Sequence, residues 1–283
     1  MTNPAIQYSP SNAGTADTSR GPSPQIWGDC PWIEILGQAG QGRGGICFHD
    51  DFDVYGLATV VTTAIATVDG RYTQFGGAGA TITRDLALGG GLVMSITDDN
   101  QSVTMLGNAA SYQISANLGK LWFEARIKTS TITTAEQAWM VGLQDYIAPT
   151  ATVPLTATGT IAATMNFVGF HKQEANTTAF DASYKANGVA AVEVNADVGT
   201  LAADTYIKLG MIFDPSTATT GTANQLAYYI NGVRQTSFAT IPDGTGDGFP
   251  ADVRLSPIIS ALAATDDTET LTIDWWRVAQ IIA

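Results

Sequence analysis

The sequence predicts an all-β protein: a two-sheet antiparallel jelly-roll sandwich with an extended N-terminal arm. Short runs of β-branched and aromatic residues recur along the chain, separated by Gly, Pro, Asn and Asp, which is the pattern of strands and turns. Helical periodicity is almost absent. The pair Asn231-Gly232 stands between two such runs and is a strong signal for a β-hairpin. These observations predict one large sandwich over residues 48–283 rather than two small domains.

Residues 1–47 differ in composition and are predicted to form the arm. They hold five of the eleven prolines and many Ser, Thr, Asn and Gly residues, so they cannot bury enough apolar surface to fold alone. Large apolar side chains nevertheless occur along the arm, and these need a partner surface. We expect them to bind a neighbouring protein; the alternative is that the arm packs on its own sandwich. These anchors are Ile6, Tyr8, Ile26, Trp27 and Trp32.

Within the sandwich, strands are predicted wherever apolar residues alternate or run continuously. A short turn of helix is expected at residues 133–138. Residues 145–165, rich in Ala, Thr and Pro, are expected to form a long exposed loop or an inserted hairpin. The predicted strands are residues 60–68, 92–96, 103–106, 121–128, 139–143, 167–170, 189–194, 206–214, 226–230, 233–235, 253–262 and 271–278.

The charge of the chain excludes some classes of partner. The net charge is −13 and the pI is about 4.3, so the chain repels phosphate backbones and anionic membrane surfaces. No apolar run reaches the length of a membrane span, and the first residues lack the basic start and apolar core of a secretory signal. We therefore expect neither a nucleic-acid nor a membrane partner, and synthesis in a cytoplasm.

The two cysteines both fall in or beside the arm. Cys30 and Cys47 are separated by 17 positions, which permits a disulfide, whereas a cytoplasmic product favours two free thiols. The sequence leaves both states open. No Cys/His spacing of the metal-binding type occurs.

Several segments, taken in their order, resemble a known family. They are residues 50–52, 120–126, 141–143, 167–172, 206–214, 226–233 and 271–276. The order resembles the concanavalin A-like (laminin G-like) jelly roll, and in particular tailed-phage structural proteins that include head decoration proteins. The resemblance covers about residues 48–280 and leaves out the arm.

The resemblance implies a virion structural protein rather than an enzyme. A decoration or cement protein of this kind binds the capsid exterior and stabilises the head. Its implied partners are the major capsid protein and further copies of itself, as a homo-oligomer, and no cofactor is implied. The family supplies no site residues, so the arm anchors remain the predicted partner-binding residues.

Carbohydrate binding, as a receptor- or glycan-binding module on a fibre or tail, is the main alternative. Strict alternation places Trp122 on the face of Glu124 and Trp276 on that of Asp274, with Trp275 opposite. An aromatic ring beside a carboxylate suits a sugar, so Trp122 and Trp276 are the candidate glycan-facing residues. The alternative is that both tryptophans pack in the core or at a subunit interface.

Enzymatic and metal sites have weaker support in the sequence. The strand motif that gives glycosidases of this fold their paired carboxylates is missing, and His49 and His171 have no nucleophile beside them. No metal site is predicted, although Asp243 and Asp247 in a Gly-rich turn are weak calcium candidates.

Overall fold

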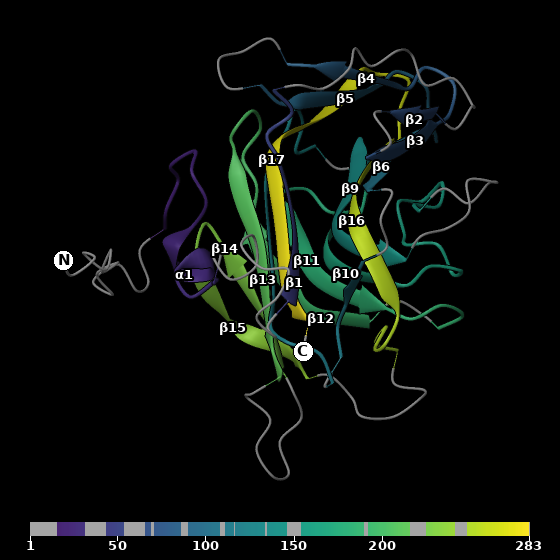
Figure 1. Ribbon diagram of the computed structural model, residues 1–283. Helices are drawn as coiled ribbons and strands as arrows, with labels where there is room; N and C mark the ends of the chain where they lie inside the picture. The colour runs from purple at the N-terminus through teal and green to yellow at the C-terminus, as the bar shows by residue number, and fades with distance from the viewer. Residues whose placement is uncertain are drawn as a thin grey trace.

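The computed structural model describes residues 16–31, 44–53, 66–68, 71–85, 90–107, 111–115, 117–133, 135–145, 154–189, 192–215, 225–240 and 248–282. These residues form two packed antiparallel sheets and one short helix, so the prediction of an all-β sandwich is confirmed (Figure 1). Among the described residues, no helix has the length and apolar content that a membrane crossing requires.

Sheet A is built around the longest described strand, β17 (Glu269–Ile282). On one side of β17 the order is β8 (Leu121–Thr129), β13 (Ile207–Asp214), β14 (Gln225–Ile230) and β15 (Val233–Thr240). On the other side, the first half of β17 pairs with β5 (Leu92–Ile96), which pairs with β4 (Thr81–Arg84). The second half pairs with β1 (Gly44–Asp50), which begins before residue 48, the predicted start of the sandwich.

Sheet B has β16 (Arg254–Ala263) at its centre. On one side of β16 lie β9 (Gln137–Asp145), β10 (Phe167–Lys172), β11 (Ala179–Lys185) and β12 (Val192–Thr200). On the other side lie β6 (Ser102–Gly107), β3 (Tyr72–Gly76) and β2 (Ala66–Val68), while β7 (Tyr112–Gln113) pairs with the start of β16.

The main core fills the space between the sheets. Along β8 the residues Leu121, Phe123, Ala125 and Ile127 point into this core, and the alternate residues therefore point to the outer face of sheet A. A second apolar cluster lies on the outer face of sheet B, under residues 154–165. There the buried His171 ring hydrogen-bonds through Nε2 to the carbonyl of Gly159, 2.7 Å away, which fastens this loop to β10.

Two local predictions have different outcomes. The hairpin at Asn231-Gly232 is confirmed: Ile230 pairs with Val233, and both turn residues have positive φ, as a type I′ turn requires. The helical turn expected at residues 133–138 is wrong in its described part, where a turn leads directly into β9. The helix is instead α1 (Pro24–Trp27), in the predicted arm.

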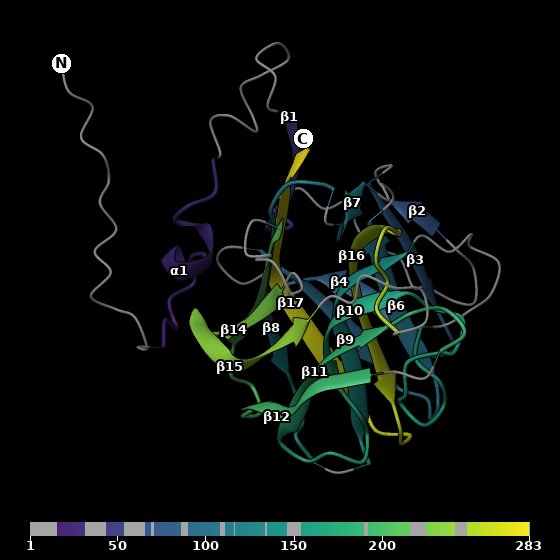
Figure 2. The ribbon, with the colours of Figure 1, turned by 90° about the horizontal axis from the view of Figure 1, so that it is seen from below.

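Residues 16–31, here called the covering segment, lie on the outer face of sheet A. α1 contacts β8 and β13, and Figures 1 and 2 both show it outside these strands, away from sheet B. A Cβ on Gly210 of β13 would come within 2.2 Å of the Ile26 side chain, so the glycine makes room for Ile26 to dock. The covering segment therefore packs on its own sandwich.

Candidate functional site: the covered face of sheet A

The face of sheet A beneath the covering segment is polar and aromatic. We call it the covered face and define it by outward side chains of β8, β13 and β17. A segment that only packs on a sheet is ordinarily met by apolar residues. Here an apolar cluster that includes Ile212 and Ala279 meets part of the segment, and carboxylates, cations and indoles meet the rest. The covered face consists of Trp122, Glu124, Arg126, Lys128, Lys208, Asp274 and Trp275.

Glu124 is the most deeply enclosed group of the covered face, with 0% of its surface exposed. Its Oε2 accepts hydrogen bonds from the backbone N–H of Ser23 at 3.0 Å and from Trp27 Nε1 at 2.7 Å. Its Oε1 has no hydrogen-bond partner among the described residues. Burial raises the pKa of Glu124, and these hydrogen bonds oppose that rise only in part.

Lys208 fixes the start of the covering segment. Its Nζ donates to Asp17 Oδ2 at 2.7 Å and to the carbonyl of Gly21 at 3.0 Å, and only 1% of its side chain is exposed. The backbone N–H of Asp17 also donates to the carbonyl of Asn231 in the β14–β15 turn, at 2.7 Å. The start of the segment is thus held by one ion pair, by a hydrogen bond from Lys208 to a backbone carbonyl and by one backbone–backbone hydrogen bond.

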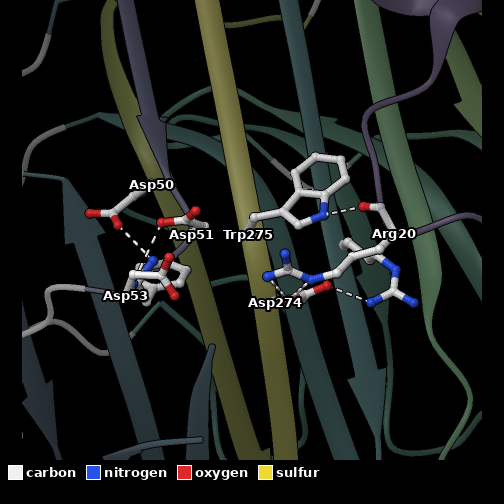
Figure 3. A network of polar contacts seen from close by, with 8 residues as sticks. Arg20, Asp50, Asp51, Asp53, Asp274 and Trp275 are labelled. Atoms are coloured by element: carbon white, nitrogen blue, oxygen red, sulfur yellow. Dashed lines mark hydrogen bonds and ion pairs between the residues drawn. The ribbon is translucent and has the colours of Figure 1, made fainter. Parts of the chain in front are cut away.

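Asp274 joins the covering segment to β8 (Figure 3). Arg20 donates to Asp274 Oδ1 from Nη2 at 2.8 Å and from Nε at 3.1 Å, while Arg126 binds Asp274 Oδ2. The neighbouring indole of Trp275 donates from Nε1 to the carbonyl of Arg20 at 2.6 Å. Both carboxylate oxygens are therefore engaged by guanidinium groups, and the hydrogen bonds to Asp274 raise the pKa of Arg20.

The acidic turn after β1 lies beside this network in Figure 3. Asp50 accepts hydrogen bonds from the Phe52 N–H at 2.7 Å and from the Tyr72 hydroxyl at 2.6 Å, and pairs with Arg71 at 3.1 Å. These contacts hold Phe52 at a φ of 60°. The role of Asp50 is thus structural, while Asp51 and the exposed Asp53 add negative potential near Arg20.

Tyr206, at the entry to β13, lies at the edge of the covered face and is half-buried. The guanidinium of Arg126 is 3.9 Å from the centroid of its ring, and Lys128 Nζ is 5.2 Å from it. An aromatic ring flanked by two cations and close to a carboxylate can stack on a sugar ring and donate hydrogen bonds to its hydroxyls. This edge is the partly open portion of the covered face.

The structure places the two candidate glycan-facing tryptophans differently. Trp122 does share the face of Glu124, as predicted, but it is 1% exposed, and its Nε1 donates to Asp29 of the covering segment at 2.9 Å. Trp276 is 0% exposed, inside the main core. Neither ring is open to solvent, so a glycan would reach neither of them unless the chain moved.

The predicted alternation in β17 is wrong after Ile273. The pairing of β17 with β8 shifts register between Ile273 and Trp275, so one extra residue enters β17 at Asp274. As a result Trp276, rather than Trp275, joins Ile273 in the core, and Asp274 and Trp275 both contact Arg20. A one-residue shift of this kind leaves no mark in the alternation pattern itself.

The predicted partner-binding residues divide into two groups. Ile26 and Trp27 are buried against the sheet of their own chain, so the alternative of packing on the sandwich applies to them. Ile6, Tyr8 and Trp32 lie outside the described residues, as do the calcium candidates Asp243 and Asp247. In the part of the chain that is described, no group of three or more His, Cys, Asp or Glu side chains could hold a metal ion.

The two histidines lie in different sheets, His49 in β1 and His171 in β10, so they form no common site. The alternative that the arm packs on its own sandwich did not identify residues 16–31 or the face of sheet A that they cover. The one signal is charge: Asp17, Arg20 and Asp29 meet opposite charges on Lys208, Asp274 and Lys120. These charge pairs can be recognised only when the strands that carry the partner residues have been placed side by side.

Neither a family model nor a curated protein sequence matches this chain. Among solved structures, a protein of unknown function from Shewanella oneidensis MR-1 is 13% identical, with a TM-score of 0.53 over 89% of this chain and 92% of that one. A pseudo β-1,3-glucanase of Mycobacterium tuberculosis, also described as an immunostimulatory antigen, is 12% identical, with a TM-score of 0.51 over 83% and 98%. Peanut lectin is 14% identical, with a TM-score of 0.49 over 84% and 99%.

The chain has the fold of a concanavalin-like jelly roll. At such low identity the similarity describes the fold alone, and many functions share a fold. The function therefore has to be argued from the residues of the covered face.

Proposed function

We propose that this chain binds carbohydrate through the covered face of sheet A, entering at the edge formed by Tyr206, Arg126 and Lys128. The observation that carries the proposal is the stacking of the Arg126 guanidinium 3.9 Å from the half-buried Tyr206 ring, beside Asp274. The part of the half-buried ring that Arg126 does not cover offers an amphipathic surface to the C–H groups of a sugar, and the charged groups suit its hydroxyls. The sugar-related names of structural neighbours agree with this choice of ligand class.

We propose binding without hydrolysis. A glycosidase needs one carboxylate as an acid and a second as a nucleophile or base, both within reach of the glycosidic bond. Glu124 is sealed under Ser23 and Trp27, and both oxygens of Asp274 are taken by arginines. Neither carboxylate can therefore contact a glycosidic bond while the covering segment is in place.

The test is a glycan array probed with the full chain, followed by titration of any hit. Tyr206→Ala and Lys128→Ala should each weaken binding about tenfold or more, the effect expected of a central contact residue. Arg254→Ala removes an exposed cation at the start of β16 in sheet B and is the matched control, which should bind as the wild type does. The recovered glycan should be unchanged in length.

Two results would overturn this proposal. One is a chain that binds no glycan on a broad array. The other is a specific hit that Tyr206→Ala and Lys128→Ala leave unaltered. Shortened glycan products would instead support a hydrolase.

The net charge of −13 favours a second candidate function, decoration of a capsid exterior, because a shell protein must stay soluble at high local concentration. Among the described residues, the exposed large apolar side chains are Val189 and Ile282. In this second proposal we therefore assign the apolar contact with the capsid to the predicted anchors Ile6, Tyr8 and Trp32. The proposed partners are the major capsid protein and copies of the chain. Micrographs of particles assembled with and without the chain test this, and particles lacking added density would contradict it.

A further inference from the structure

Both cysteines of the chain belong to the same apolar cluster. Cys30 lies at the end of the covering segment and is buried, and the partly buried Cys47 of β1 packs against the same cluster. Cys47 pairs with Ala279 of β17, and Ala279 pairs with Trp122 of β8, so the cluster spans three adjacent strands under Cys30. The two thiol groups are also close enough to influence each other electrostatically.

We propose that Cys30 and Cys47 form an intramolecular disulfide under oxidising conditions, and that this bond locks the covering segment onto sheet A. In the sequence, Cys30 precedes residues 32–43 and Cys47 follows them, and the fold brings both thiols to the same apolar cluster. One belongs to the segment that covers Glu124, and the other to a strand of the sheet itself. The cross-link therefore joins the cover to the surface that it covers.

The reaction needs an oxidant, for which a low-molecular-weight disulfide such as oxidised glutathione suffices. The Cys47 thiolate, the more accessible of the two, attacks one glutathione sulfur, and the glutathione S–S bond breaks to release one glutathione thiolate. The Cys30 thiolate then attacks the Cys47 sulfur of the mixed disulfide and releases the second glutathione. The two protons lost by the cysteines end on the two glutathione thiols.

The structure also predicts that this oxidation is slow. Burial raises the pKa of Cys30 to about 12 and raises the pKa of Cys47, so few thiolates exist at neutral pH in the closed state. Cys30 reacts chiefly when the covering segment opens. Once formed, the bond suppresses that opening, because the segment can no longer move far from β1.

The experiment uses the full chain, first reduced and then treated with oxidised glutathione at mildly alkaline pH. After denaturation and alkylation, the intact mass should show the loss of two hydrogens and no alkylated thiol. A non-reducing peptide map should contain one species linking the peptides of Cys30 and Cys47. Trypsin cleavage after Arg20, in the covering segment, should slow by about tenfold or more on oxidation, because the cross-link removes open states. Reduction should restore the original rate.

Cys30→Ala and Cys47→Ala are the matched controls. In both variants, oxidised glutathione should leave the rate of trypsin cleavage after Arg20 unchanged. Glutathione adducts that persist on the wild-type cysteines, intermolecular dimers, or two thiols still open to alkylation would each overturn the proposal. These readouts concern the thiols and the covering segment, so they do not depend on whether a glycan binds.

Discussion

Trp27→Phe should loosen the covering segment while leaving the sandwich folded. Phenylalanine keeps most of the apolar contact with Ile26 and Trp122 but loses the hydrogen bond from Trp27 Nε1 to Glu124 Oε2, 2.7 Å long and fully buried. Leaving a buried acceptor without one of its donors costs about 1–3 kcal/mol. The population of the open segment should therefore rise roughly fivefold to a hundredfold, since each 1.4 kcal/mol is about a factor of ten.

Trypsin cleavage after Arg20 measures this population. Arg20 is 46% exposed, but its guanidinium is bound by Asp274 in the closed state, so cleavage requires the segment to open. When opening and closing are fast compared with cleavage, the rate follows the open population. Mass spectrometry of the Arg20–Gly21 bond separates this cut from cuts elsewhere.

Trp139→Phe is the matched control for this experiment. Trp139 lies fully buried in β9 of sheet B, and its Nε1 has no hydrogen-bond partner among the described residues. The same substitution there removes no hydrogen bond and should leave cleavage after Arg20 as in the wild type. If Trp27→Phe is cleaved no faster than the control, the bond to Glu124 does not hold the segment and the reasoning fails.

Two further predictions concern pH. Burial raises the pKa of Glu124, so the folded state binds the carboxyl proton of Glu124 more tightly than the unfolded chain does. The stability that this proton contributes is therefore present below the ordinary Glu pKa and is lost as the pH rises through the raised pKa. Urea unfolding at several pH values should show that loss in the wild type and not in Glu124→Gln, and identical pH profiles would refute it. For His171, burial lowers the pKa from 6.5 to about 4, so the wild type should lose up to about 3 kcal/mol as the pH falls through that window. His171→Gln, whose amide can donate to the Gly159 carbonyl, should lose less over the same window; an equal loss would point to other groups.

The fold was predictable because it rests on local signals. Alternation along residues 121–128 placed Trp122 and Glu124 on one face correctly, and Asn231-Gly232 marked its hairpin. The candidate site was much less predictable. The register shift at Asp274 reversed the faces of Trp275 and Trp276, and this depends on the pairing of β17 with β8 rather than on any residue type.

The covering segment was also beyond a sequence-based prediction. Its composition resembles that of a free arm, and apolar anchors such as Trp27 indicate that some surface is bound without saying which one. The decisive contacts, from Lys208 to Asp17 and from Glu124 to Trp27, join residues that are far apart in the chain. Such contacts become visible only when strands distant in sequence have been brought together.

The position of β16 and β17 has a consequence for how the protein is made. Both are last in chain order, yet each is the central strand of its sheet. During synthesis the edges of β8 and β9 must wait unpaired until residues 254–282 have left the ribosome, and sheets built from such distant pairings form slowly. Unpaired strand edges bind other chains readily, so the nascent protein needs protection until residues 254–282 have paired. A chain that stops before residue 254 would hold separate groups of strands with no centre to join them, so completion of both sheets depends on β16 and β17 together.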